Sequence, residues 1–424
     1  MKYCKRCLYP ANHPLNITFD EAGVCSGCRV HEEKDFLDWP YREKKLRNIL
    51  DMYRNQSNLN YDCIIPVSGA RDSYFIVHTI KNVYGMTPLL VNYNNHYNTK
   101  MGIQNLSYLR TLLGCDIITL TLDPKVVKKI TRHTLERIAS MYWHCIAGQS
   151  VFPVQAAVKF KIPLIIWGVH QGCDQVGMFS HLDEVEMTRK YRKEHDLMGF
   201  EPEDLIDEIK RITKKNIRPY MYPHDKEIQR VGCRGIYLSN YIRWDSKRQH
   251  EMMIGLYDYD TSEQWRTFDA YNDVDSFHYS GTHDYIKFLK YGFGKVTDHA
   301  CREIRLKRLT REEGIELVKK YQNKKPEDLK YFLNWIGMTE EEFFGYINTR
   351  RDPRIWKKYE NGDWELLDSV INHAHDAGLE NVRLEKVEDC EFVITEDRVE
   401  ATENEYALLT RGYVDEYLKN RPEG

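Results

Sequence analysis

The sequence predicts an α/β protein with a parallel sheet, preceded by a small cysteine-rich segment and followed by a mostly helical region. The sheet is predicted by short apolar runs at 63–67, 88–91, 116–122 and 162–168, with helical patterns between them. Strands that alternate with helices in this way form a parallel sheet with helices on both faces. Paired cysteine motifs within the first 28 residues predict a separate metal-binding element.

The composition has balanced charge and many cysteines. The 424 residues carry 61 Lys and Arg against 64 Asp and Glu, a net charge of −3, which argues against nucleic acid as the main partner. No apolar run approaches the roughly 20 residues that cross a membrane, and no apolar signal segment follows Met1. Eleven cysteines without such a segment fit a reducing compartment. We therefore expect a cytoplasmic protein of two or three domains without a membrane partner.

The first forty residues contain two C-x2-C pairs separated by 17 residues. This spacing is typical of a structural zinc site, in which four thiolates complete a tetrahedral shell and leave no position for a substrate. The alternatives are an iron–sulfur cluster, a site in which His31 replaces one thiol, and four unrelated buried cysteines. We expect structural Zn²⁺ bound by Cys4, Cys7, Cys25 and Cys28.

The segment Ser68-Gly69-Ala70-Arg71-Asp72-Ser73 follows the first apolar strand and opens an amphipathic helix that ends near Gly85. A strand, a tight loop and a helix N-terminus build an anion site, because backbone N–H groups without intrahelical partners point at the ligand. Ser68, Ser73 and Arg71 add donors, and Gly69 permits close approach of a phosphate. No Walker A motif occurs in the chain, and the alternative interpretation is an ordinary helix-capping turn.

The remaining elements follow from the same patterns. We expect helices at 41–57, 103–113, 124–142, 151–161, 310–321 and 339–347, and a charged, helical, solvated excursion at 183–215. Ligands of parallel sheets bind at the carboxyl ends of the strands, so residues 68–73, 92–95 and 168–170 should surround one crevice. His170 and Cys173 lie on the loop after the fourth strand and are expected to be structural.

The loop SGARDS resembles the SGGxDS loop of the PP-loop ATP pyrophosphatases, which transfer AMP to a substrate oxygen. The resemblance implies an adenine nucleotide α-hydrolase-like, Rossmann-like fold that binds ATP and Mg²⁺, with residues 68–73 on the pyrophosphate. Ala70 stands where that family has its second glycine. An alanine is compatible with the loop if this residue does not adopt a positive φ.

The ordered series of segments over residues 1–352 is similar to the N-acetyl sugar amidotransferase family, a branch of the PP-loop enzymes. Its members convert an acetamido group on a sugar to an acetamidino group in surface-polysaccharide, O-antigen and nonulosonic-acid biosynthesis. The matching segments are the cysteine pairs, the loop, 92–105, 165–168, 235–245 and 291–305. Val169-His170 departs from the Glu-Asn pair of the family, and residues 353–424 lie outside the similarity.

This resemblance implies an AMP- and pyrophosphate-forming ligase that acts on an N-acetylated, nucleotide-linked sugar. Arg71 and Asp72 are the implied catalytic residues, and Asn92, Asn95 and Gly168 are expected near the nucleotide. For the sugar we expect contacts from Arg243, Trp244, Asp245, Lys295 and Asp298, with Glu303 and Arg305 nearby. Cys233 does not lie in a G-x-C-x-G elbow. The resemblance implies that ammonia comes from a separate glutaminase–cyclase pair.

The chain divides into zinc knuckles (1–40), a PP-loop ATP pyrophosphatase domain (41–230), a substrate or partner region (231–352) and an appended extension (353–424). Two other functions stay open. A PP-loop tRNA thiolase would deliver sulfur to an adenylated base and would need Cys145, Cys173 and Cys233 to converge near the loop. A scaffold whose nucleotide site has decayed is the non-enzymatic alternative.

Overall fold

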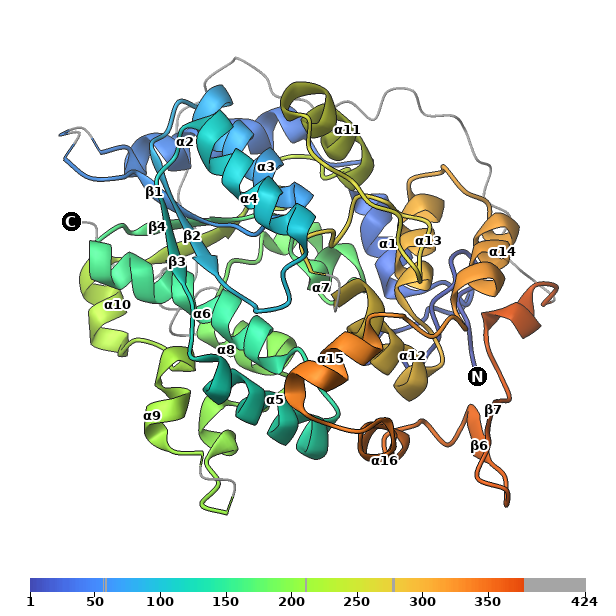
Figure 1. The fold of residues 1–424 in the computed structure, drawn as a ribbon. Coiled ribbons are helices and arrows are strands. Elements are labelled where there is room, and N and C mark those ends of the chain that lie inside the picture. The colour runs from blue at the N-terminus through green and yellow to red at the C-terminus, as the bar shows by residue number, and fades with distance from the viewer. Residues whose placement is uncertain (56, 58, 210–211, 277–278, 377–424) are drawn as a thin grey trace.

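The computed structural model describes residues 1–55, 57, 59–209, 212–276 and 279–376. Its centre is a five-stranded parallel sheet with strand order β3-β2-β1-β4-β5 (Figure 1). The strands are β1 (Cys63–Pro66), β2 (Pro88–Tyr93), β3 (Ile117–Leu120), β4 (Leu164–Trp167) and β5 (Arg234–Tyr237). The predicted parallel sheet is confirmed. It extends past residue 230, where the sequence-based division ended this domain, because β5 pairs with β4.

Helices cover both faces of the sheet, and the strand side chains alternate between them. Cys63 and Ile65 belong to the core under one group of helices, whereas Ile64 points into the core under the other, as the period of two requires. The first group is α2 (Trp39–Tyr53), α3 (Arg71–Val77), α4 (Lys100–Leu113) and α11 (Ser246–Tyr257). The second includes α6 (Trp143–Phe160) and α10 (Asp225–Val231), with α5 (Pro124–Ile138) packed on α6.

The helix after the loop begins at Arg71 and runs through α3 directly into the π-helical segment η1 (His78–Val83). Gly85 follows with φ of +64°, a conformation that glycine adopts without strain, so the predicted helix end is confirmed. The predicted helix at 151–161 instead begins at Trp143 and contains Pro153 in its interior.

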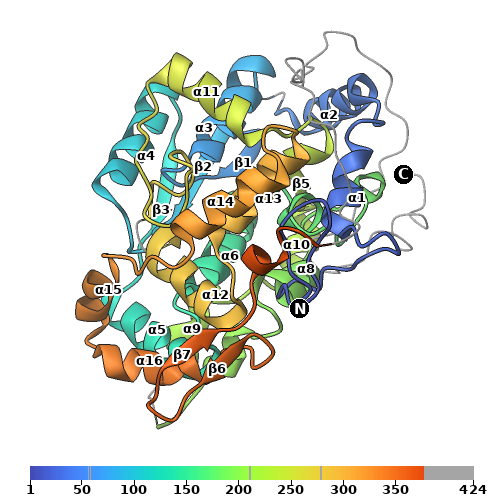
Figure 2. The same cartoon turned by 90° about the vertical axis from the view of Figure 1, so that its right-hand side faces the viewer.

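The C-terminal part of the described chain is helical, as predicted, apart from one hairpin. It comprises α12 (Asp284–Tyr291), α13 (Lys295–Arg305), α14 (Arg311–Tyr321), α15 (Leu329–Ile336), α16 (Glu340–Asn348), the strands β6 (Trp356–Lys358) and β7 (Trp364–Leu366), and η8 (Val370–His373). The helices α13 and α14 pack on the N-terminal cysteine segment, whereas α12, α15 and α16 share a core with α5 (Figure 2). The region therefore contacts both the N-terminal cysteine segment and α5. The apolar pattern at 385–399 lies outside the described residues.

The charged segment after residue 183 differs from the expectation. It forms η2 (His181–Asp183), α8 (Arg189–Tyr191), η3 (Arg192–Asp196), η4 (Pro202–Leu205), α9 (Lys214–Ile217) and η5 (Arg218–Tyr220) instead of one long helix. Glu186, Arg192 and His195 are buried. The Arg192 guanidinium donates to Ser150 Oγ at 3.0 Å and to the Tyr220 carbonyl at 2.9 Å. The prediction of a solvated excursion is wrong here, because buried polar partners compensate these charges.

None of the helices in the described part of the chain has the length and apolar character that crossing a membrane requires.

Candidate active site and metal centre

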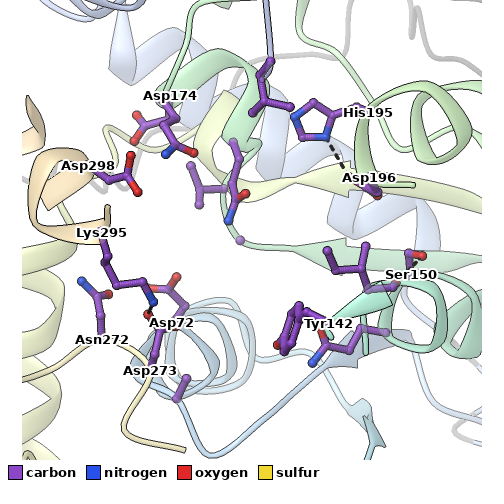
Figure 3. Close-up of a pocket in the computed structure, with 18 of the residues that line it drawn as sticks. Asp72, Tyr142, Ser150, Asp174, His195, Asp196, Asn272, Asp273, Lys295 and Asp298 are labelled. Atoms are coloured by element: carbon purple, nitrogen blue, oxygen red, sulfur yellow. Dashed lines mark hydrogen bonds and ion pairs between the residues drawn. The ribbon is translucent and has the colours of Figure 1, made fainter. Parts of the chain in front are cut away.

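A pocket of about 900 Å³ lies at the carboxyl ends of the strands (Figure 3). Pro66, Tyr93, Trp167 and Tyr237, the last residues of β1, β2, β4 and β5, all line it. This is the edge at which open parallel sheets bind their ligands. The volume is near the upper end of the range for small-molecule sites, which is roughly 300–1,000 Å³.

The loop after β1 forms one wall of this pocket, with Ser68, Ala70, Arg71, Asp72 and Ser73 among the lining residues. The backbone N–H of Ser68 donates to Ser73 Oγ at 2.9 Å, and that of Ala70 donates to Ser68 Oγ at 3.1 Å. These bonds hold the loop in a defined shape at the start of α3. Ala70 has φ of −89° and ψ of 162°, so the alanine at the second glycine position of the resembling loop is free of backbone strain.

Arg71 and Asp72 form an ion pair at 2.8 Å at the beginning of α3. The Nη1 atom of Arg71 is buried and has no hydrogen-bond partner among the described residues. Burial opposes the charge of this guanidinium, but Asp72 and then Asp269 raise its pKa, so Arg71 is a permanent cation. An unpaired guanidinium N–H beside a loop of this kind is suited to binding a phosphate oxygen.

A segment far along the chain completes this wall. Asp273 and Asp275 line the pocket together with Ser68 of the loop. Burial, followed by repulsion from Asp273, raises the pKa of Asp275 to about 6. Asp273 is in turn paired with Lys295 at the start of α13. Sequence reasoning missed both carboxylates, although the spacing Asp-x-Asp was a signal that could have found them.

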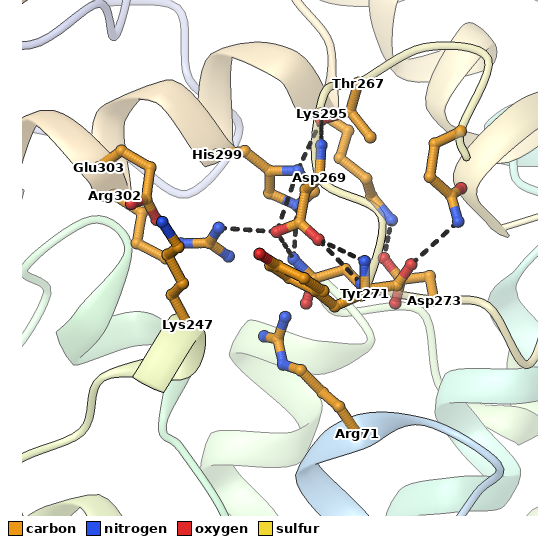
Figure 4. A network of polar contacts seen from close by, with 12 residues as sticks. Arg71, Lys247, Thr267, Asp269, Tyr271, Asp273, Lys295, His299, Arg302 and Glu303 are labelled. Carbon is orange, nitrogen blue, oxygen red and sulfur yellow. Dashed lines mark hydrogen bonds and ion pairs between the residues drawn. The ribbon is translucent and has the colours of Figure 1, made fainter. Parts of the chain in front are cut away.

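A polar network holds the same segment in place (Figure 4). Asp269 is buried and accepts from Arg302 Nη2 at 2.7 Å and from the backbone of Asn272 at 2.9 Å. The side chain of Asn272 also contacts Nε2 of His299, at 3.1 Å. Arg71 points toward this network from the beginning of α3. The loop and the C-terminal helices are therefore joined by charge as well as by packing.

The predicted nucleotide contacts Asn92 and Asn95 do not line the pocket. Asn92 Nδ2 donates to the Val67 carbonyl at 2.8 Å, and Asn95 Oδ1 accepts from the Tyr97 backbone at 3.1 Å. Both amides thus hold the strand ends in position. Gly168 does line the pocket, where a β-carbon would approach Trp244 to 3.2 Å.

The five predicted sugar contacts separate into two sets. Trp244, Lys295 and Asp298 line the pocket. Arg243 instead pairs with Asp35 at 2.6 Å, and Asp245 caps α11 and accepts from Arg308 at 2.7 Å. Neither Arg243 nor Asp245 is among the lining residues.

Val169 and His170 follow β4 at the positions where the resembling family has a Glu-Asn pair. Val169 lines the pocket, whereas His170 is buried beneath it. The Nδ1 atom of His170 accepts from the Cys173 backbone at 3.1 Å and caps α7 (Gln171–Asp174). His170 therefore stabilises the loop that carries Gln171, Asp174 and Gln175 into the pocket wall.

The four N-terminal cysteines converge as their spacing predicts. The sulfur atoms of Cys4, Cys7, Cys25 and Cys28 are buried and lie within 4.8 Å of one another. Four convergent thiols fit a tetrahedral metal ion such as zinc. His31 is outside this set of ligands.

Arg305 links this cysteine cluster to the pocket. Its Nε lies 3.5 Å from the Cys28 sulfur, and its Nη1 donates to the carbonyl oxygens of Asp174 at 3.1 Å and Gln175 at 2.7 Å. Burial opposes its charge, but the neighbouring thiols, Cys28 first, raise the pKa of the guanidinium. Arg305 of α13 thus joins the cysteine cluster to one wall of the pocket.

Comparison with known proteins gives one informative match. Residues 263–370 match the family model described as "LPS biosynthesis protein WbpG-like, C-terminal domain". This match includes Asp273, Asp275 and Lys295 of the pocket and Arg305 beside the cysteines. The structure of NMN synthetase from Francisella tularensis is similar at 13% identity and a TM-score of 0.26, covering 52% of this chain and 96% of that chain. No curated protein sequence matches significantly. Residues 263–370 are therefore similar to the C-terminal domain of WbpG-like LPS biosynthesis proteins, which supports the resemblance to the sugar amidotransferases of surface-polysaccharide synthesis.

Proposed function

We propose that this protein is an ATP-dependent amidotransferase that converts the acetamido group of a nucleotide-linked sugar to an acetamidino group. The observation that carries the proposal is that Ser68 of the loop and Asp275 of the WbpG-like segment line the same pocket. This arrangement joins a candidate nucleotide-binding loop to a domain of LPS biosynthesis proteins at one pocket. We further propose that it acts in the cytoplasm in the synthesis of surface-polysaccharide sugars.

The amide must be activated before ammonia can displace its oxygen, because an amide oxygen is a poor leaving group. Attack of the amide oxygen on the α-phosphorus of ATP forms a C–O–P linkage to AMP and releases pyrophosphate. Ammonia then adds to the carbon, and AMP leaves as a phosphate monoester. The contribution of the protein is to position the reactants and to neutralise charge.

In this proposal the residues of the first wall hold the leaving pyrophosphate. Ser68, Ser73 and Arg71 would donate to its oxygens, and the beginning of α3 would add the favourable end of its dipole. Asp72, Asp273 and Asp275 supply the oxygen ligands that Mg²⁺ prefers, and all three line the pocket. Bound there, Mg²⁺ would offset the negative charge of the phosphates.

The sulfur-transfer alternative has less support. Cys145, Cys173 and Cys233 are all buried, and no cysteine is among the described residues that line the pocket. Burial raises the pKa of Cys173 and of Cys233 to about 12. A thiol with so high a pKa is a poor source of the thiolate that sulfur chemistry requires.

The proposal is tested by incubating the zinc-loaded protein with ATP, Mg²⁺, ammonium and a panel of nucleotide-linked N-acetylated sugars. We expect pyrophosphate release that depends on one sugar, and a product mass that shows oxygen replaced by NH. Arg71→Gln should lose this activity, whereas Arg110→Gln on the exposed face of α4 should retain it.

Two results would contradict the proposal. In the first, no sugar gives pyrophosphate or amidine, but the protein modifies tRNA after it is loaded with persulfide. That result would establish the tRNA thiolase. The other is failure to bind ATP with Mg²⁺, which would indicate a decayed scaffold. Addition of a separate glutaminase–cyclase pair with glutamine tests the source of ammonia, since it should replace ammonium at low concentration.

A further inference from the structure

A histidine–carboxylate pair lies on another part of the pocket wall. His195 and Asp196, at the end of η3, both line the pocket, and His195 Nδ1 lies 2.8 Å from Asp196 Oδ1 (Figure 3). The segment that carries the pair belongs neither to the loop after β1 nor to the WbpG-like match. The pair has no part in the proposed binding of the pyrophosphate or Mg²⁺.

The imidazole is held in a defined orientation by its neighbours. The ring of Tyr191 stacks on it, with centroids 4.6 Å apart and planes 20° from parallel. Arg192 anchors the same helical turn through its bonds to Ser150 and Tyr220. Because stacking and the carboxylate fix the ring, its other nitrogen is held in one orientation for proton transfer.

The other ring nitrogen of His195 faces the pocket without a partner. Only 8% of this residue is exposed, and Nε2 has no hydrogen-bond partner among the described residues. Because Asp196 accepts from Nδ1–H, the neutral ring carries its lone pair on Nε2. A buried acceptor without a partner in a polar pocket is available to a hydrogen-bond donor of a bound ligand.

A second histidine of the pocket has the opposite arrangement. In His13 the Nδ1 atom accepts from the Leu15 backbone at 3.2 Å, so the neutral ring carries hydrogen on Nε2, which is also without a partner in the described chain. Burial lowers the pKa of His13 well below its ordinary value, so this ring is neutral. His13 is therefore a hydrogen-bond donor to the pocket, and His195 is an acceptor.

We propose that His195, oriented by Asp196, is the general base that accepts a proton from ammonia as it adds to the adenylated amide. This inference rests on the proposed function and assigns the residue for its second half-reaction. The lone pair of ammonia forms the C–N bond, and His195 Nε2 takes one proton from the new nitrogen. The C–O bond to AMP then breaks with its electrons on the phosphate oxygen. The imidazolium returns its proton to the amidine, which leaves as amidinium.

The test separates the two half-reactions in His195→Gln, His195→Ala and Asp196→Asn. Adenylation is followed as sugar-dependent pyrophosphate release, and ammonia addition as amidine formed per pyrophosphate. We expect His195→Gln to keep pyrophosphate release while amidine formation falls about 100-fold or more, which is typical of the loss of a general base. Amidine formation by Asp196→Asn should also fall, and added imidazole should restore amidine formation by His195→Ala.

Glu194→Gln is the matched control, because Glu194 is an exposed carboxylate of the same helical turn outside the pocket. It should retain the amidine yield of the parent. Amidine formation at the parental rate in His195→Gln would overturn the proposal. So would loss of pyrophosphate release in a His195→Gln or Asp196→Asn protein with parental thermal stability, because His195 would then act in substrate binding or adenylation. Failure of the parent itself to release pyrophosphate would instead contradict the proposed function.

Discussion

Gly69 and Gly102 are packed so closely that a β-carbon on Gly69 would lie 2.1 Å from the Gly102 carbonyl oxygen. Gly102, in the first turn of α4, is itself closely covered, because a β-carbon there would lie 2.4 Å from the Cα atom of Asp275. The loop after β1, α4 and the WbpG-like segment therefore meet backbone to backbone. This contact places the loop beside Asp275 in the candidate active site.

Substitution should have different effects at the two adjacent small residues of the loop, Gly69 and Ala70. Gly69→Ala places a methyl group against a backbone carbonyl that cannot move without shifting α4, so we expect loss of ATP binding and lower thermal stability. Ala70→Gly should retain binding, because φ of −89° suits either residue, and should cost about 1 kcal/mol or less in stability. Calorimetric ATP binding and thermal unfolding measure both effects. Equal binding by Gly69→Ala and the parent would show that the close contact is unimportant.

Removing one cysteine of the N-terminal cluster should release its metal ion. In Cys25→Ser we expect zinc content, measured by elemental mass spectrometry, to fall and thermal stability to drop strongly, since structural zinc contributes directly to folding. Cys115→Ser, a buried cysteine outside the cluster, is the control and should keep its zinc. If the parent contained iron and showed a visible absorption band, the four cysteines would bind an iron–sulfur cluster and not zinc.

Replacing Arg305 with lysine, which has fewer hydrogen-bond donors, should destabilise both the cysteine segment and the pocket wall. Arg305→Lys leaves the carbonyl oxygens of Asp174 and Gln175 without their planar donor, which costs about 1–3 kcal/mol for buried acceptors. Urea unfolding measures this loss. Arg350→Lys, an exposed arginine that donates to the Arg137 carbonyl, should change stability by less than about 0.5 kcal/mol. Similar losses in the two variants would remove the special role of Arg305.

Asp275 should make the unliganded protein less stable as pH rises. Its pKa is raised from 3.8 to about 6 in the folded protein, so between these values the unfolded chain has lost a proton that the folded chain keeps. Stability is then lost as pH increases through this window, and the full cost is present above it. The cost is at most about 3 kcal/mol, since each pKa unit corresponds to about 1.4 kcal/mol.

Asp275→Asn removes this dependence, so its stability relative to the parent should increase from about pH 4 to about pH 7 in urea unfolding without nucleotide. Asp258→Asn, a change at an exposed carboxylate, should differ from the parent by less than about 0.5 kcal/mol at both pH values. A constant difference between Asp275→Asn and the parent at all pH values would contradict the raised pKa.

Local patterns in the sequence determined the parts of this protein that depend on neighbours along the chain. Short apolar runs between helical patterns predicted β1, β2, β3 and β4, and the C-x2-C spacing predicted the four convergent sulfurs. The small residues of the loop predicted its place between β1 and α3. In each case the physical determinant, such as a short apolar run or the reach of a tight turn, acts within a few residues.

The tertiary structure decided which side chains meet in the pocket. Asn92 and Asn95 follow the predicted strand end, but their amides bond to nearby backbone and do not line the pocket. Ser68, His195 and Asp275 line one pocket only because distant segments fold onto the sheet edge. Burial of Arg192 and His195 in a charged stretch depends on partners from α6 and η5, which no local pattern contains. The sequence alone determined the sheet, the loop and the cysteine cluster, and long-range packing decided the chemistry available around them.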